Sequence, residues 1–128
     1  MGQVQLPSHF TPTHETEGLP GFPAVDVFAP AGTQVLAPAT GKVVKLSGHP
    51  PTATSPPGGP YGWSIYLTAR DGGTYYMTHF GSRNAYCKVG ACIGRGEPIG
   101  KVAAYSKATH GVTADHIHLG YHKGVWAP

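Results

Sequence analysis

Residues 63–80 read WSIYLTARDGGTYYMTHF, and this stretch has the pattern of a β-hairpin. The first run is rich in aromatic and β-branched residues, and Trp63, Ile65 and Leu67 fall on one face of an extended strand. The DGG triplet at 71–73 is a turn signal, because glycine adopts the backbone conformations that tight hairpin turns require. The second run, TYYMTHF, is therefore the expected partner strand.

Short extended segments continue on both sides of this hairpin. VDVFA, QVLA and KVVKL precede it, separated by Gly and Pro turns, and the alternating DHIHLGYH follows it near the C-terminus. No stretch has helical periodicity. Residues 1–24 are predicted to be an extended N-terminal segment, and the Pro- and Gly-rich residues 48–60 a loop insertion. We therefore expect an all-β fold of mainly antiparallel sheet with long loops and little or no helix.

The size and composition of the chain fit one compact domain spanning residues 1–128. Gly (19) and Pro (13) make up a quarter of the 128 residues, which alone is compatible with disorder. The 40% of hydrophobic residues and the seven tyrosines argue against disorder and for a turn-rich β domain.

Charge and hydropathy exclude several classes of function. The net charge of +3 suits contact with anionic cell-wall polymers, but no cluster of Lys and Arg predicts nucleic-acid binding. No apolar run is long enough to predict a membrane span, and the first ten residues show no secretory signal. Cys87 and Cys92 lack the spacing of a zinc ribbon or redox motif, and the sequence leaves open whether they form a local disulfide or stay free.

The histidines suggest where the chemistry lies. His116 and His118 are two residues apart, so on a strand both imidazoles project to the same face and can bind a metal or transfer a proton. This pair alone is equally well explained as two polar residues on a solvated face. Asp26 and His79, however, also lie on strand-like segments. A carboxylate with several histidines is the donor set of a hydrolytic zinc site, which uses three protein ligands and a water.

Four blocks of sequence, in order, resemble peptidase family M23, the lysostaphin or LytM type, over residues 14–121. The first begins at Asp26 and continues through Gly32-Thr33 to Val43, and the second joins Asp71-Gly72 to His79 and Phe80. The third is the run GRGEPIGKV at 94–102, and the fourth is TADHIHL at 113–119. The resemblance implies a zinc-dependent endopeptidase that cleaves the stem or cross-bridge peptides of bacterial peptidoglycan.

The same resemblance implies roles for individual residues. Asp26 and His118 match zinc ligands of the family, and His79 and His116 match the histidines that polarise the attacking water and stabilise the tetrahedral intermediate. It also implies a place of action outside the cell or facing the wall. A secreted hydrolase, a phage endolysin and a wall-cutting domain of a phage tail or larger chain all fit this implication.

One position departs from the family pattern. The first family block is H-x-x-x-D, but Phe22 stands four residues before Asp26 and cannot bind zinc. We expect His14 to supply the missing ligand, because the turn formed by residues 18–21 can bring it back to the cleft. His9, Glu15 and Glu17 are weaker candidates. The alternative is a degenerate M23 module that binds cell wall or serves as a structural component of a larger assembly.

Overall fold

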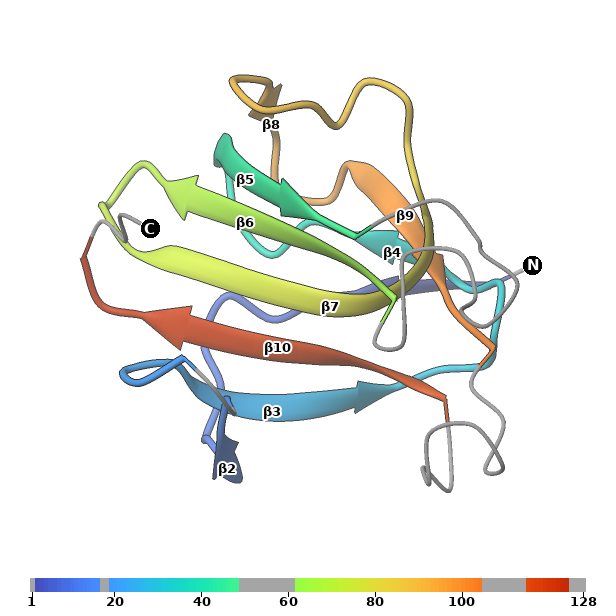
Figure 1. Ribbon diagram of the computed structural model, residues 1–128, viewed down its shortest axis with the longest axis horizontal. Coiled ribbons are helices and arrows are strands. Elements are labelled where there is room, and N and C mark those ends of the chain that lie inside the picture. Colours follow the sequence, from blue (N-terminus) through green and yellow to red (C-terminus); the bar gives the residue numbers. More distant parts are fainter. Residues whose placement is uncertain (1, 17–18, 49–61, 105–114, 125–128) are drawn as a thin grey trace.

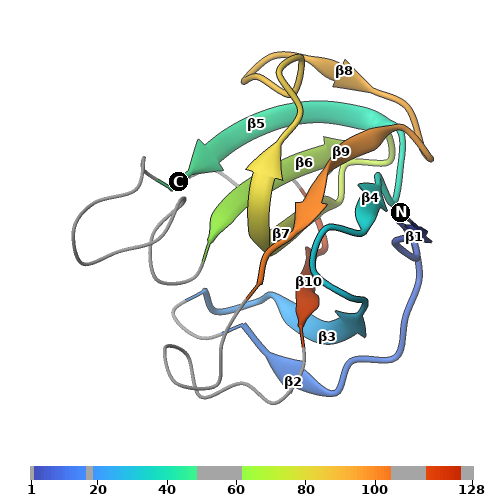
Figure 2. The same ribbon diagram turned by 90° about the vertical axis from the view of Figure 1, so that its right-hand side faces the viewer.

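The computed structural model describes residues 2–16, 19–48, 62–104 and 115–124. Over these ranges it contains ten strands, which join into one strongly curled sheet, and no helix (Figures 1 and 2). Among the described strands, only β1 and β4 pair in parallel. The expected all-β, mainly antiparallel architecture is confirmed. The strands are β1 (Gln3–Gln5), β2 (His14–Glu15), β3 (Pro23–Phe28), β4 (Gln34–Leu36), β5 (Gly41–Ser47), β6 (Trp63–Ala69), β7 (Thr74–Arg83), β8 (Cys92–Ile93), β9 (Pro98–Val102) and β10 (His116–His122).

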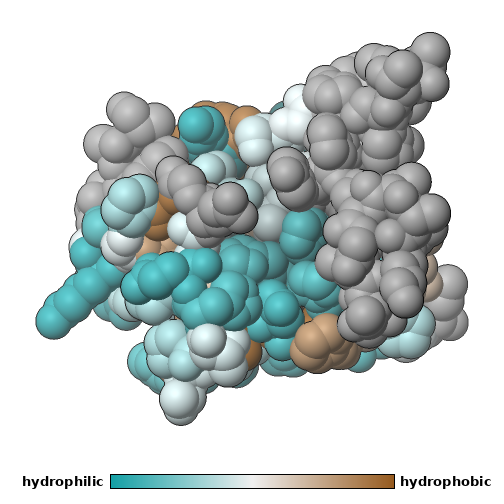
Figure 3. All heavy atoms as spheres, turned by 60° about the horizontal axis from the view of Figure 1, so that its bottom comes forward, coloured by the Kyte–Doolittle hydropathy of each residue, from teal (hydrophilic) through white to brown (hydrophobic). Residues whose placement is uncertain are grey.

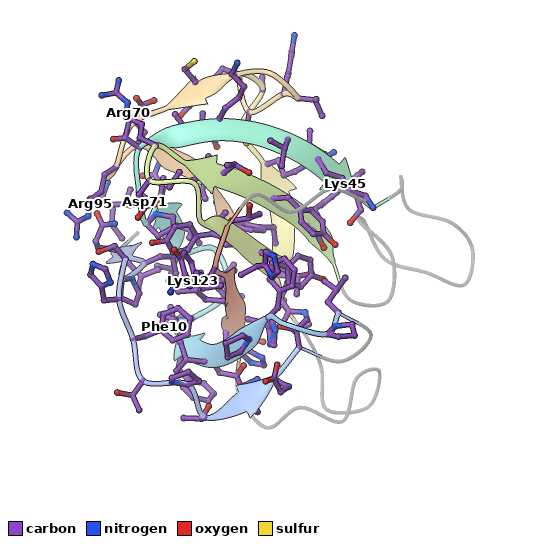
Figure 4. The ribbon with its side chains drawn as sticks, turned by 90° about the vertical axis from the view of Figure 1, so that its left-hand side faces the viewer. Phe10, Lys45, Arg70, Asp71, Arg95 and Lys123 are labelled. Carbon is purple, nitrogen blue, oxygen red and sulfur yellow. The ribbon has the colours of Figure 1, made fainter. Side chains whose placement is uncertain are left out.

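The predicted hairpin is formed by β6 and β7. Its two strands pair antiparallel through the turn at 70–73, where the Gly73 N–H donates to Asp71 Oδ1 at 2.9 Å and Gly72 has φ +94°. Ile65 and Leu67 lie in the hydrophobic core and Trp63 packs against it, as the alternation predicted. Arg70 and Asp71 mark this turn at one end of the sheet, and Lys45 lies toward the opposite end (Figure 4).

Strand β7 organises the rest of the sheet. It pairs with β6 along one edge, while its other edge has two partners in succession. Residues 74–78 pair with β10, and residues 80–83 pair with β9. Beyond β10 lie β3 and then β2, as Figure 1 shows, and beyond β9 lie β4 and β1. The sheet therefore divides at His79, where the edge of β7 changes from one partner to the other.

The core fills the inside of this curled sheet. It also takes up Leu6, which is fully buried, so the N-terminal segment is part of the fold. The Tyr75 hydroxyl donates to Ser8 O at 2.7 Å and holds the same segment against β7. The extended segment predicted for residues 1–24 thus contains the short strands β1 and β2. Other fully buried side chains are Phe22, Val35, Val43, Ile65, Leu67, Met77, Phe80, Ile93, Ile99, Ile117 and Leu119.

The two cysteines, a membrane span and the loop at 48–60 were the remaining subjects of the sequence-based predictions. Cys87 is buried and Cys92 exposed, and both are free thiols. No helix within the described ranges is long and apolar enough to cross a membrane. Apart from Gly48, the loop predicted at 48–60 lies outside the described residues.

Candidate active site

A row of polar side chains crosses three neighbouring strands on one face of the sheet. Asp26 of β3 pairs with His118 of β10, which in turn pairs with Thr78 of β7. His116 lies two residues from His118 and therefore projects to the same face. Figure 3 looks at the molecule from the side of β2 and β3 and shows hydrophilic residues gathered there. The sheet thus brings Asp26, His116 and His118 together, as the sequence predicted.

Strand β2 adds His14 to this group. It pairs antiparallel with β3, so that His14 lies opposite Ala24 and Glu15 opposite Pro23. Because side chains alternate along a strand, His14 shares the face of Ala24 and Asp26, and Glu15 points to the other face. Figure 2 shows the N-terminal segment running down one side of the sheet to β2.

Three donor atoms form a nearly equilateral triangle. His14 Nε2 lies 3.3 Å from His118 Nδ1 and 3.4 Å from Asp26 Oδ1, and His118 Nδ1 lies 3.6 Å from the same oxygen. Two donors bound at about 2.0–2.1 Å to one tetrahedral zinc ion lie about 3.3 Å apart. The spacing and chemistry of these three donors therefore fit a zinc ion.

The protonation of His118 agrees with a role as ligand. Burial is the largest cause that lowers the pKa of His118 below its ordinary value of 6.5. The neighbouring imidazoles of His14 and His116 also lower it, and the Asp26 carboxylate opposes them without reversing the shift. At neutral pH the imidazole is therefore uncharged and one of its nitrogens carries a lone pair. A neutral imidazole is the form that binds a metal.

His79 reaches the site through an unusual backbone conformation. In strict alternation it would follow Tyr75 and Met77 into the core, and Phe80 would face the cleft. Instead, Phe80 is fully buried and His79 has φ +80°, a left-handed value that is uncommon for a residue other than glycine. The pairing register shifts on both edges of β7 in this region. The His79 ring accordingly lies 4.9 Å from the ring of His116, edge to face.

His116 lies at the inner end of the cluster. Its side chain is largely buried, and Nε2 lies 3.6 Å from Asp26 Oδ1. Its ring also lies 5.4 Å from the ring of Phe28, which is 63% exposed. Phe28 also lines a hollow of about 360 Å³, together with Ala29, Pro30 and Asp115. Phe28 thus lies between this hollow and the ring of His116.

Phe22 has a structural role at the position where the family pattern has histidine. It is fully buried, and its ring stacks on His122 at 5.1 Å with an interplanar angle of 27°. His122 Nδ1 lies 3.1 Å from Gly21 O, at hydrogen-bonding distance, so this histidine is committed to packing at the start of β3. Among the described residues, neither His9 nor Glu15 joins the donor group of His14, Asp26 and His118. Glu17 lies outside the described residues.

The sequence analysis missed two threonines beside the histidines. Thr16 Oγ1 lies 2.9 Å from His118 Nε2, and Thr13 Oγ1 lies 2.8 Å from His14 Nδ1. Thr16 stands two residues after His14, so the alternation that places His14 on the cleft face applies to Thr16 as well. That signal becomes visible only once residues 14–16 are known to be extended along β3.

Comparison with known proteins identifies the family. The model of peptidase family M23 matches residues 22–127. A search of curated protein sequences gave no significant match.

Solved structures share the fold. The solution structure of lysostaphin is 26% identical, with a TM-score of 0.56 over 77% of this chain and 35% of that one, so this chain spans about a third of its length. The lysostaphin catalytic domain from Staphylococcus simulans is 24% identical, with a TM-score of 0.61 over 93% of this chain and 81% of that one.

Two further structures are more distant. A point mutant of the catalytic domain of EnpA, a prophage-encoded M23 protein of Enterococcus faecalis, is 19% identical, with a TM-score of 0.58 over 88% of this chain and 77% of that one. A zinc-containing peptidase from Vibrio cholerae is 18% identical, with a TM-score of 0.58 over 93% of this chain and 37% of that one. Since the family model spans most of the sequence and the sheet agrees with these structures, the chain belongs to peptidase family M23.

Proposed function

We propose that this chain is a zinc-dependent endopeptidase that hydrolyses peptide bonds in bacterial peptidoglycan. The observation that carries the proposal is the triangle of His14 Nε2, Asp26 Oδ1 and His118 Nδ1, with His79 and His116 facing it. Membership of the M23 family and the likeness to lysostaphin and to a zinc-containing peptidase support the same assignment.

His14, Asp26 and His118 would hold the ion, which leaves a fourth position for water. Zinc bound there would act as a Lewis acid and lower the pKa of a bound water to about 7. Asp26 would contribute negative charge, and the two neutral imidazoles would contribute lone pairs. His14 would take the place of the family histidine that Phe22 replaces.

His79 and His116 act on the reacting groups. The two rings lie edge to face at 4.9 Å, and His79 is 6.3 Å from the ring of His118. One imidazole accepts the proton of the attacking water, and the other donates a hydrogen bond to the carbonyl oxygen as negative charge develops on it. His116 Nε2 also lies 3.6 Å from Asp26 Oδ1, which places His116 directly beside the donor triangle.

The substrate class sets the place of action. An enzyme that cuts the stem or cross-bridge peptides of peptidoglycan works outside the cell or at the wall. The likeness to a prophage-encoded M23 protein supports a phage-borne enzyme, either an endolysin or a wall-cutting domain of a virion tail.

The test is cleavage of purified peptidoglycan. The protein is incubated with sacculi of different cross-bridge composition, and new amino groups are measured by labelling and located by mass spectrometry. We expect cleavage that a zinc chelator abolishes and added zinc restores, with Asp26→Ala inactive throughout. A wild-type protein that binds zinc but releases no amino groups from any sacculus would contradict the enzyme and favour a wall-binding module.

A further inference from the structure

Two threonines of one short segment contact the two histidines that we propose as zinc ligands. In each histidine, the ring nitrogen that points away from the donor triangle lies next to a threonine hydroxyl. His14 uses Nε2 toward the donor triangle, and its Nδ1 lies 2.8 Å from Thr13 Oγ1. His118 uses the opposite nitrogen, Nδ1, and its Nε2 lies 2.9 Å from Thr16 Oγ1. Residues 13–16 therefore contribute one donor atom and a partner for each of the two imidazoles.

The chemistry of imidazole gives these contacts a function. A neutral imidazole carries a proton on one nitrogen and a lone pair on the other. It can bind a cation only through the nitrogen without the proton, so the proton has to occupy the far nitrogen. A hydroxyl oxygen that accepts a hydrogen bond from that far N–H favours the correct tautomer and fixes the plane of the ring.

Thr16 is the better placed of the two threonines. Its side chain is buried at 7% exposure, whereas Thr13 is exposed. Its backbone is held on both sides: the N–H donates to Phe22 O at 2.9 Å, and the carbonyl accepts from Leu19 N at 3.2 Å. A buried hydroxyl on a fixed backbone holds its partner in one position.

Gly120 leaves the space that the Thr16 hydroxyl occupies. A β-carbon on Gly120 would lie 2.8 Å from Thr16 Oγ1 and 3.4 Å from the β-carbon of Phe22. Gly120 lies two residues after His118 on the same face of β10, so the hydroxyl reaches the imidazole across the bare backbone of Gly120.

We propose that Thr16 is a positioning residue for His118: it holds the imidazole in the tautomer that presents Nδ1 to zinc. Thr13 acts on His14 in the same way, with a smaller effect because it is exposed to competing water. The proposal rests on the zinc site of the proposed function. It assigns Thr16 no contact with the ion or with substrate.

The first test is zinc affinity in matched variants. Thr16→Val keeps the shape of the side chain and removes the hydroxyl, and Thr16→Ser restores a hydroxyl. Competition with a chromophoric chelator measures the zinc dissociation constant of each. We expect Thr16→Val to weaken binding by about 10–100-fold, the range for loss of such a partner, and Thr16→Ser to remain close to wild type. Thr13→Val should weaken it less. Equal affinity of Thr16→Val and wild type would overturn the proposal.

A second measurement needs no zinc and separates this inference from the proposed function. Nitrogen-15 NMR of the zinc-free protein reports which nitrogen of His118 carries the proton. The Asp26 carboxylate, 3.6 Å from Nδ1, favours the proton on Nδ1 in both proteins, so we expect a larger fraction protonated on Nε2 in the wild type than in Thr16→Val. Unchanged circular dichroism is the control for folding. A wild type that never binds zinc would end the proposed function, and the tautomer result would then decide the role of Thr16. The same ratio of tautomers in both proteins would reject that role.

Discussion

His14 Nε2 and Asp26 Oδ1 lie 3.4 Å apart, although the two side chains belong to different strands. The contact depends on the pairing of β2 with β3, which places residue 14 on the cleft face. The contact predicts how zinc binding responds to substitutions in the N-terminal segment.

Replacing His14 with alanine should remove one of three proposed ligands. We expect zinc affinity to fall by more than about 100-fold, beyond the range for loss of an outer hydrogen-bonding partner. Isothermal titration at pH 7 measures this, and His9→Ala is the matched control because His9 is an exposed histidine of the same segment. Equal losses in both variants would indicate a general effect of the segment and no ligand at position 14.

Adding a methyl group at Gly120 should disturb the site without touching a donor atom. In Gly120→Ala the new β-carbon meets Thr16 Oγ1 at 2.8 Å, so the hydroxyl has to move away from His118. We expect zinc affinity to fall by up to about tenfold and stability by about 1–3 kcal/mol through overpacking. Calorimetry and chemical unfolding measure the two effects. Gly2→Ala, where a β-carbon would contact nothing within 4 Å, should change neither.

Substituting His79 should separate catalysis from zinc binding. His79→Asn removes the imidazole, and asparagine tolerates the left-handed backbone conformation better than most residues, which suits φ +80°. We expect kcat for peptidoglycan cleavage to fall by about 10²–10⁴-fold, with zinc content unchanged. His79→Gly controls for the backbone, since glycine adopts this φ without strain. An asparagine variant with wild-type kcat would exclude His79 from proton transfer and oxyanion stabilisation.

Removing the hydroxyl of Tyr75 should flatten the alkaline limb of the stability profile. Burial raises the pKa of Tyr75 from 10.0 to about 12. Between pH 10 and pH 12 the Tyr75 phenol keeps its proton in the folded protein, whereas in the unfolded chain the same phenol begins to lose its proton near pH 10. The resulting contribution to stability is full below pH 10 and is lost as the pH rises toward 12.

The comparison is Tyr75→Phe against wild type in urea unfolding at pH 8 and pH 10.5. At pH 8 the variant should be less stable by about 1 kcal/mol, because it lacks the hydrogen bond to Ser8 O. Between the two pH values it should lose less stability than the wild type. Parallel profiles for the two proteins would mean that Tyr75 ionises equally readily in the folded and unfolded states.

Much of the fold could be predicted, because the strands and the hairpin turn are indicated by residues close together in the sequence. Alternation in residues 63–69 gave the inner face of β6, and the DGG triplet gave the turn to β7. The two-residue spacing of His116 and His118 placed both on one face of β10. These inferences need only the period of a strand and the preferences of turn residues.

The remainder depends on tertiary structure. His79 reaches the cleft through a left-handed backbone conformation at the point where β7 changes partners, and no residue type in TYYMTHF signals such a break in alternation. The place of His14 was predicted from the need for a third ligand, whereas the contact of Thr16 with His118 required the register of β2 against β3. Pairing between distant segments sets these positions.

The short strand β2 also has a consequence for where the functional unit begins. The family match starts at Phe22, downstream of every residue that β2 brings to the cleft. A protein trimmed to that boundary would keep Asp26 and all three cleft histidines of β7 and β10, and would look complete by its family blocks. It would nevertheless lack His14 and both threonine hydroxyls, along with Leu6 from the core. In this chain the family's usual ligand position serves packing, and the donor that completes the triangle lies in a stretch that the family boundary leaves out.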